Sequence, residues 1–205
     1  MTQLSMPVGM LRISWYLPET ECLGPGKRFA IWVQGCRQRC EGCIAQRLQD
    51  TEGGVLVPVA KLTDAVLQTS GLEGLSISGG EPFLQSEGLA LLLRTIRTHR
   101  PSLGVIVYSG YTYEMLQADS AAQALLAQTD LLIDGQYRPE LDDGNAMRGS
   151  SNQRLLYLTE RYRNVQMPQY RSSELRFADG SMRLVGIPSG AAREALTLFT
   201  NGGSL

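Results

Sequence analysis

The sequence is poor in cysteine and histidine, has almost no net charge and contains no long apolar run. Of its 205 residues only four are cysteine and one is histidine, and the formal net charge is −1. Such an even balance of charge gives no electrostatic case for binding nucleic acid or an anionic membrane surface. No apolar run approaches the roughly 20 residues of a bilayer-spanning helix, and residues 1–7 are too polar for a secretory leader. We therefore expect a cytoplasmic protein without nucleic-acid or membrane partners.

Three of the four cysteines stand close together. Residues 36–43 read CRQRCEGC, so Cys36, Cys40 and Cys43 form a CxxxCxxC pattern directly after the strand-like stretch 28–34. Iron–sulfur clusters take cysteine thiolates as ligands, and a four-iron cluster normally takes four of them. Three cysteines on one loop would leave one iron without a protein ligand, free to bind something else. The pattern therefore predicts a [4Fe–4S] cluster with an open iron.

Other interpretations of the cysteines are less favoured. A structural zinc ion needs four N or S ligands, and Cys22 or His99 could complete the set, but neither has the paired spacing of a zinc knuckle. A disulfide framework suits small secreted chains, and buried, inert thiols remain a further alternative. We expect Cys22 to be a lone thiol in a loop and His99 to lie at a solvated helix end.

A second signal follows the cysteines by about one strand–helix unit. Residues 75–82 read LSISGGEP, an apolar strand that ends in two glycines, an acid and a proline that can open a helix. Glycine lets backbone groups approach a ligand closely. The carboxylate of Glu81 brings negative charge to the same edge, which suits a ligand ammonium.

The middle of the chain alternates between strands and helices, which predicts an α/β fold with a parallel sheet. A DG turn is expected to join a C-terminal hairpin at 174–177 and 182–185, and 201–205 to form a frayed tail. We expect strands at 11–16, 28–34, 75–78, 103–108, 131–134 and 155–158, and helices at 58–70, 86–100 and 111–128.

The candidate ligand-binding residues all follow strands. Parallel sheets bind ligands at the carboxyl ends of their strands. The cysteine loop follows one strand, Gly79 to Glu81 follow the next, Ser109 follows the third, and Asp134 closes the fourth. We therefore expect these residues to converge on one rim.

At this point the sequence resembles the radical S-adenosylmethionine (SAM) superfamily, and within it the activases of glycyl-radical enzymes, above all those of anaerobic ribonucleotide reductase. The resemblance covers roughly residues 10–190. Besides the cysteine and GGE segments, it is carried by GPGKR at 24–28, IWVQGC at 31–36, YSGYT at 108–112, DLLIDG at 130–135 and RGSSNQR at 148–154. One departure is Ile44-Ala45-Gln46 after the third cysteine, where activases usually have an aromatic residue or histidine and then asparagine.

The resemblance implies a fold and a set of binding residues. The fold would be a partial (β/α) barrel of about five to six mostly parallel strands, within a single radical SAM domain over 1–205. The three cysteines would hold a [4Fe–4S] cluster whose open iron binds SAM. Gly79, Gly80 and Glu81 would contact the methionine ammonium, and Ser109, Asp134 and Asn152 would bind the ribose and neighbouring polar groups. No protein side chain would be catalytic, because the radical is generated at the cluster-bound cofactor.

The resemblance also implies an activity and partners. The enzyme would cleave SAM reductively to a 5′-deoxyadenosyl radical and install a glycyl radical on a partner enzyme. The stretches 24–28 and 148–154 would frame a surface for a protein loop. The alternatives are direct action on a small metabolite or peptide, and a redox sensor that does not cleave SAM. Too few cysteines remain for a second four-iron cluster, so we expect a flavodoxin or ferredoxin as electron donor.

Overall fold

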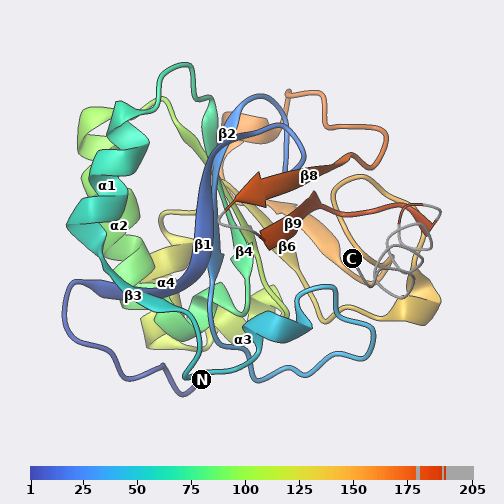
Figure 1. Ribbon diagram of the computed structural model, residues 1–205, viewed down its shortest axis with the longest axis horizontal. Coiled ribbons are helices and arrows are strands. Elements are labelled where there is room, and N and C mark those ends of the chain that lie inside the picture. Colours follow the sequence, from blue (N-terminus) through green and yellow to red (C-terminus); the bar gives the residue numbers. More distant parts are fainter. Residues whose placement is uncertain (179–180, 191, 193–205) are drawn as a thin grey trace.

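A seven-stranded mixed sheet forms the centre of the molecule (Figure 1). The computed structural model describes residues 1–178, 181–190 and 192. The strand order is β3-β1-β2-β4-β5-β6-β7, and β8 and β9 form a separate hairpin. The strands are β1 (Met10–Thr20), β2 (Arg28–Val33), β3 (Val55–Pro58), β4 (Gly74–Gly79), β5 (Gly104–Tyr108), β6 (Leu131–Asp134), β7 (Arg154–Tyr157), β8 (Ser173–Ala178) and β9 (Ser181–Gly186).

The four central strands β2, β4, β5 and β6 are parallel neighbours. On one side β1 pairs antiparallel with β2 and β3 antiparallel with β1, and on the other side β7 pairs antiparallel with β6. Five of the seven strands therefore run in the same direction. Every residue of β2 and β6 is buried, as is typical of parallel strands that are covered on both faces.

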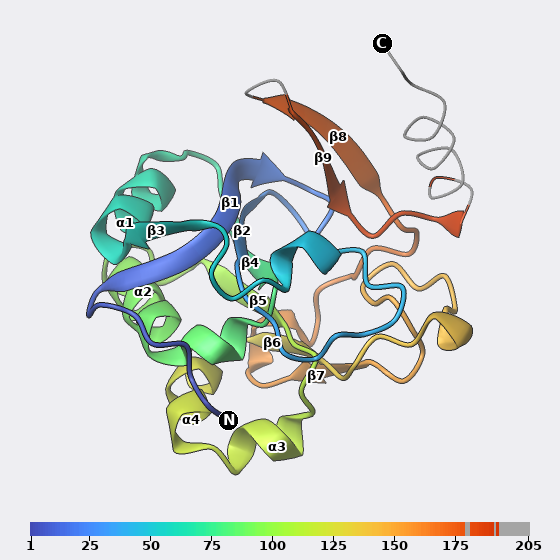
Figure 2. The ribbon, with the colours of Figure 1, turned by 60° about the horizontal axis from the view of Figure 1, so that its bottom comes forward.

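The helices cover one face of the sheet, and the β8–β9 hairpin lies on the other side (Figure 2). Leu62, Leu89 and Leu92 from two of these helices are fully buried in one core with residues of β1, β2, β4 and β5. On the hairpin side Trp15 and Trp32 stack with ring centroids 4.0 Å apart, and Val185 is buried in the same cluster as Trp32. The helices are α1 (Val59–Gln68), α2 (Ser86–His99), α3 (Tyr113–Gln117) and α4 (Ser120–Leu126).

The predicted helix at 111–128 is wrong in one respect, because the structure has two helices there. The hydroxyl of Thr112 caps α3, and the carboxylate of Asp119 caps α4 by accepting hydrogen bonds from the backbone of Ala121 (2.9 Å) and Ala122 (3.3 Å). An aspartate that bonds to its own downstream backbone ends one helix and begins another.

The α/β fold, the sheet and the C-terminal hairpin are confirmed, but the strand count is seven rather than five to six. The additional strand, β3, is a four-residue edge strand that pairs with β1, from Met10 opposite Pro58 to Ile13 opposite Val55. Because β3 and β7 end the strand order, the sheet is open and no closed barrel forms within the described residues. A partial barrel goes beyond these pairings and stays a prediction. The predicted DG turn and the tail at 201–205 lie outside the described residues.

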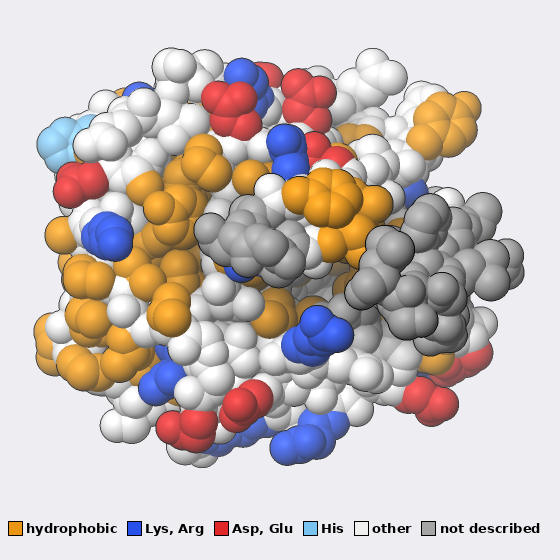
Figure 3. All heavy atoms as spheres, in the orientation of Figure 1, with side chains coloured by type: hydrophobic (Ala, Val, Ile, Leu, Met, Phe, Trp, Pro, Cys, Tyr) orange, Lys and Arg blue, Asp and Glu red, His pale blue; other side chains and the backbone are white. Residues whose placement is uncertain are grey.

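Apolar side chains also reach the surface near this edge. Val55 and Leu56 of β3 are exposed, and Figure 3 shows apolar side chains gathered over the part of the face where α1 and β3 lie. None of the helices within the described ranges has the length and apolar character needed to cross a membrane.

Arg28, the last residue of the stretch at 24–28, has a structural role, whereas the surface expected from the stretch as a whole stays a prediction. The Arg28 side chain is fully buried, because the guanidinium donates to Ser76 Oγ (2.6 Å) and to the carbonyls of Leu75 (2.5 Å) and Gly104 (3.2 Å). These acceptors belong to β4 and β5, so Arg28 ties the start of β2 to its neighbours. The stretch at 24–28 thus contributes a sheet contact at the edge opposite the cysteine loop.

Candidate functional site

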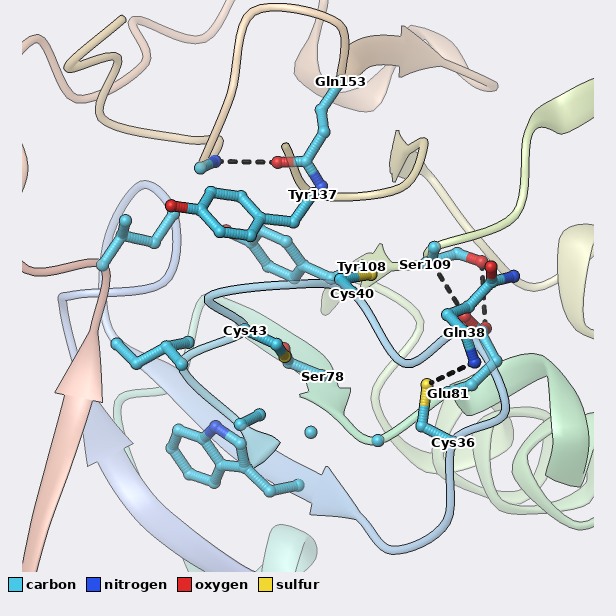
Figure 4. A pocket seen from close by; sticks show the side chains of 18 of the residues that line it. Cys36, Gln38, Cys40, Cys43, Ser78, Glu81, Tyr108, Ser109, Tyr137 and Gln153 are labelled. Atoms are coloured by element: carbon cyan, nitrogen blue, oxygen red, sulfur yellow. Dashed lines mark hydrogen bonds between the residues drawn. The ribbon is translucent and has the colours of Figure 1, made fainter. Parts of the chain in front are cut away.

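A cavity opens at the carboxyl-terminal edge of the central parallel strands (Figure 4). Its walls come from the loops that follow β2, β4, β5 and β6, from the segment before β7, and from the end of β9. The lining includes all three motif cysteines, Gly79, Gly80, Glu81 and Ser109, together with Leu23, Trp32, Gln38, Ile44, Ala45, Gln49, Ser78, Tyr108, Gly110, Gly135, Tyr137, Gly149, Gln153, Gly186 and Ile187. Seven of the nine residues expected at the rim therefore border one space.

The cysteine loop turns back over the end of β2. Arg39 and Gly42 have φ angles of 47° and 64°, and the Cys36 sulfur accepts a hydrogen bond from the backbone of Gln38 at 3.4 Å. A Cβ atom on Gly42 would lie 3.6 Å from the Tyr137 ring, so the loop packs closely against the segment after β6.

The three thiols are free and half-buried. Burial raises the pKa of Cys36 to about 11 and also raises the pKa of Cys43. Thiols with such pKa values are protonated at neutral pH, and a bound metal centre offsets this by stabilising the thiolates. The described residues contain no group of three His, Cys, Asp or Glu side chains gathered for a single metal ion. A four-iron cluster is larger, so its ligands stand further apart.

The GGE turn packs directly under the entry to the cysteine loop. Gly80 N donates to Val33 O and Glu81 N donates to Gly35 O, both at 2.8 Å. Gly79 has a φ of 108°, and a Cβ atom there would lie 2.5 Å from Val33 O; one on Gly80 would lie 2.3 Å from Gly35 O. Both glycines therefore allow the close approach of two backbone segments, and since both also border the cavity, their contact with a ligand ammonium stays a prediction.

Glu81 is 1% exposed and holds three hydrogen bonds. One oxygen accepts from Phe83 N (3.0 Å) and Ser109 Oγ (2.9 Å), and the other accepts from Gly110 N (2.8 Å). Burial raises the pKa of Glu81 to about 7, against the lowering effect of these bonds. A carboxylate has roughly four acceptor sites, so three donors leave room for a ligand cation, which would favour the charged form.

Asp134 and Asn152 are the two expected residues that do not border the cavity. The carboxylate of Asp134 is fully buried and accepts from Tyr113 N (2.6 Å) and from Arg154 Nε (2.9 Å) and Nη2 (2.5 Å). Asn152 Nδ2 donates to Gln136 O at 2.7 Å, and its buried Oδ1 has no hydrogen-bond partner among the described residues. Both residues stand next to lining residues, Gly135 and Gln153.

Several lining residues were not expected from the sequence. Tyr137 and Ile187 come from loops that carry no strand or helix period, so no local signal marked them. Gly149 and Gln153 lie within the stretch at 148–154 that carries part of the resemblance, which was a usable signal. Cys22 does not border the cavity; it packs at the edge of the cluster formed by Trp32 and Val185.

Several known proteins are similar to most of this chain. Residues 22–156 match the family described as a 4Fe-4S single cluster domain, a range that holds every candidate residue named above. The anaerobic ribonucleoside-triphosphate reductase-activating protein of Enterobacteria phage T4 is 30% identical over 136 residues, which are 64% of this chain and 85% of that protein. The protein of the same name from Vibrio cholerae serotype O1 is 32% identical over 148 residues, 67% of this chain and 92% of the relative.

A solved structure of QueE from Escherichia coli covers 64% of this chain and 72% of its own, with 12% identity and a TM-score of 0.43, a likeness too low to support an argument. The family match and the relatives show which family this chain belongs to. This chain belongs to the 4Fe-4S single cluster domain family, as an iron–sulfur enzyme of the radical SAM superfamily and of the activating-enzyme type.

Proposed function

We propose that this enzyme binds a [4Fe–4S] cluster through Cys36, Cys40 and Cys43, cleaves SAM reductively, and installs a glycyl radical on an anaerobic ribonucleotide reductase. The observation that carries the proposal is the cavity, because the three cysteines, the GGE turn and Ser109 border one space at the carboxyl ends of adjacent parallel strands. The activating-protein names of the relatives support the choice of target.

The donor set of the cavity fits the two cofactors. Burial raises the pKa of the Cys36 and Cys43 thiols, so a bound cation would be needed to stabilise them as thiolates, and Glu81 is a buried carboxylate with a free acceptor site. When bound, the cluster would supply one electron to break the C5′–S bond of SAM, which would give methionine and a 5′-deoxyadenosyl radical for hydrogen abstraction from the target glycine. The cofactors carry this chemistry, and the protein contributes binding and orientation.

The chain's own residues have distinct tasks in this proposal. The cysteine loop would hold the cluster, and the backbone bonds from Gly80 and Glu81 to the segment before this loop would orient the cluster relative to the ammonium site. Ser109 Oγ donates a hydrogen bond to Glu81 Oε1 at 2.9 Å, which orients the carboxylate, and the same hydroxyl would bind a hydroxyl group of the ligand. Asp134 and Asn152 do not line the cavity and would support the residues that do. Asp134 would do so through its bond with Arg154, and Asn152 through its bond to the backbone of Gln136.

We also propose that residues 1–205 form one radical SAM domain and that the open sheet is a partial (β/α) barrel. The cavity draws residues from Leu23 to Ile187, which supports one structural unit over most of the chain. The electron donor is proposed to be a flavodoxin or ferredoxin.

A second candidate function is direct action on a small metabolite or peptide. The observation in its favour is that Ile44 and Ala45 border the cavity at positions where activases usually carry an aromatic residue or histidine and then asparagine. The cavity near the third cysteine thus differs from the usual activase pattern.

Electron paramagnetic resonance tests the proposal. The protein is reconstituted anaerobically with iron and sulfide, reduced with dithionite, and mixed with SAM and the anaerobic ribonucleotide reductase from the same genome. We expect a glycyl doublet on the reductase and release of 5′-deoxyadenosine, and neither with the Cys36→Ala variant. Release of 5′-deoxyadenosine without any protein radical would favour the second function. No release, with the cluster intact, would leave only a redox sensor.

A further inference from the structure

The side chain of Gln153 joins two loops of the cavity wall. Its Oε1 accepts hydrogen bonds from Gly149 N (2.8 Å) and Ser150 N (3.2 Å), and its Nε2 donates to Gly135 O (2.9 Å). One side chain thereby links the loop after β6 to the loop before β7. Gly135, Gly149 and Gln153 itself all border the cavity.

Other hydrogen bonds also join these loops, from Asn152 Nδ2 to Gln136 O (2.7 Å) and from Arg138 N to Ser150 Oγ (3.1 Å), but Gln153 is the cavity-lining side chain that ties Gly135 to Gly149. The Tyr137 ring packs against Gly149 so closely that a Cβ atom there would lie 2.8 Å from it. Gln136 Nε2 donates to Gln38 O at 3.2 Å, which connects the same loop to the cysteine loop. A continuous wall therefore runs from the cysteine loop through residues 135–137 to residues 149–150. Gln153 connects the last two of these segments through its side-chain hydrogen bonds.

This wall lies at the end of the cavity away from the ammonium site. Figure 4 shows Gln153 and Tyr137 on one side of the cavity, and Cys36, Ser109 and Glu81 on the other. Because Glu81 would hold the amino-acid end of SAM on one side, the hydrogen donor would approach from the side of Tyr137 and Gln153. Tyr137 and Gln153 border that side, and Gly149 packs against Tyr137.

We propose that Gln153 is a positioning residue that sets the wall against which the glycine-bearing segment of the target lies. This inference rests on the proposed function. Glutamine suits the task because it both accepts and donates hydrogen bonds, whereas the carboxylate of glutamate only accepts. Replacing Gln153 with glutamate therefore keeps the bonds to Gly149 and Ser150 and removes the bond to Gly135.

The test compares Gln153→Ala, which removes both halves of the link, with Gln153→Glu, which removes one. Gln123→Ala is the matched control, since Gln123 is an exposed glutamine on α4 that donates to Gln117 O, away from the cavity. Amide hydrogen exchange of the cluster-loaded protein measures the two loops directly. The glycyl signal is then titrated against increasing reductase concentration.

We expect exchange at residues 135–137 to rise about tenfold in both variants, and exchange at Gly149 and Ser150 to rise only in Gln153→Ala. The reductase concentration that gives half-maximal radical should rise about tenfold in both, which corresponds to about 1.4 kcal/mol. Cluster content and the maximal radical per cluster should change much less. If the alanine variant does not fold, the glutamate variant carries both measurements.

Three results would overturn the inference. One is unchanged exchange at both loops in either variant. Another is altered exchange with the same reductase dependence as the wild type, which would make Gln153 a structural residue only. The third is wild-type reductase dependence in Gln153→Glu, which would remove the role of the bond to Gly135. If the wild type itself forms no glycyl radical, the proposed function fails, and the exchange data alone decide whether Gln153 holds the wall.

Discussion

Replacing Glu81 with glutamine should change how stability depends on pH in the cluster-free protein. Burial raises the pKa of this carboxylate from its usual 4.5 to about 7. Because the folded state holds the proton more tightly than the unfolded state, stability is greatest below the usual pKa and falls as pH rises towards 7. Glutamine has no proton to lose, so the variant should not show this fall.

The size of the effect follows from the two pKa values. A difference between 4.5 and about 7 corresponds to a stability loss of about 3 kcal/mol between pH 4.5 and pH 8. The substitution has its own cost at low pH, because the glutamine amide must face one of the three donors, Phe83 N, Ser109 Oγ or Gly110 N. A buried polar group left unpaired costs about 1–3 kcal/mol.

Urea unfolding of the cluster-free wild type and of Glu81→Gln, at pH 5 and pH 8, measures both effects. At pH 5 the variant should have a lower free energy of unfolding than the wild type. At pH 8 its free energy of unfolding should equal or exceed that of the wild type. Glu87→Gln is the matched control, because Glu87 is exposed at the start of α2. A stability difference between wild type and Glu81→Gln that does not change with pH would refute the reasoning, since it would mean that Glu81 is ionised at ordinary pKa in the folded protein.

Three further predictions concern the cluster, the core and a helix cap. Cys43→Ala should lose the cluster by iron and sulfide assay while Cys22→Ala keeps it, and the opposite result would require a different ligand set. Leu92→Ala removes a fully buried side chain of α2 and should cost about 2–5 kcal/mol of unfolding free energy without changing the urea m-value. Asp119→Ala removes the cap of α4 and should cost about 1 kcal/mol, with a loss below 0.3 kcal/mol speaking against the cap.

The sequence was sufficient for those parts of the site that follow strands. Cys36, Glu81 and Ser109 lie at strand ends, and parallel strands of one sheet bring their carboxyl ends to one edge. Hydrophobic runs and glycine turns located those strands, so the sequence also predicted that the residues after them meet at one edge of the sheet. Asp134 also closes a strand, but its partner Arg154 arrives from a neighbouring strand, and no local pattern indicates that this ion pair occupies the carboxylate.

Other parts could not be predicted because they depend on contacts between distant segments. The strand β3 has only four residues and an exposed pattern, so its identity comes from pairing with β1. Arginine side chains are usually exposed, yet Arg28 is buried because carbonyl groups of β4 and β5 accept its hydrogen bonds inside the fold. Tyr137 and Gln153 reach the cavity through loops whose course is set by hydrogen bonds across 18 residues of sequence.

The glycine contacts between the GGE turn and the end of β2 also bear on how ligands are captured. The bonds from Gly80 N to Val33 O and from Glu81 N to Gly35 O exist within the protein alone, so the base of the cysteine loop and the turn form a preorganised unit. The conformational entropy of bringing them together is lost during folding, and binding need not supply it again. A graft of this loop onto another scaffold would therefore need both segments and the glycines between them, since the eight-residue motif alone would carry the ligands without their alignment.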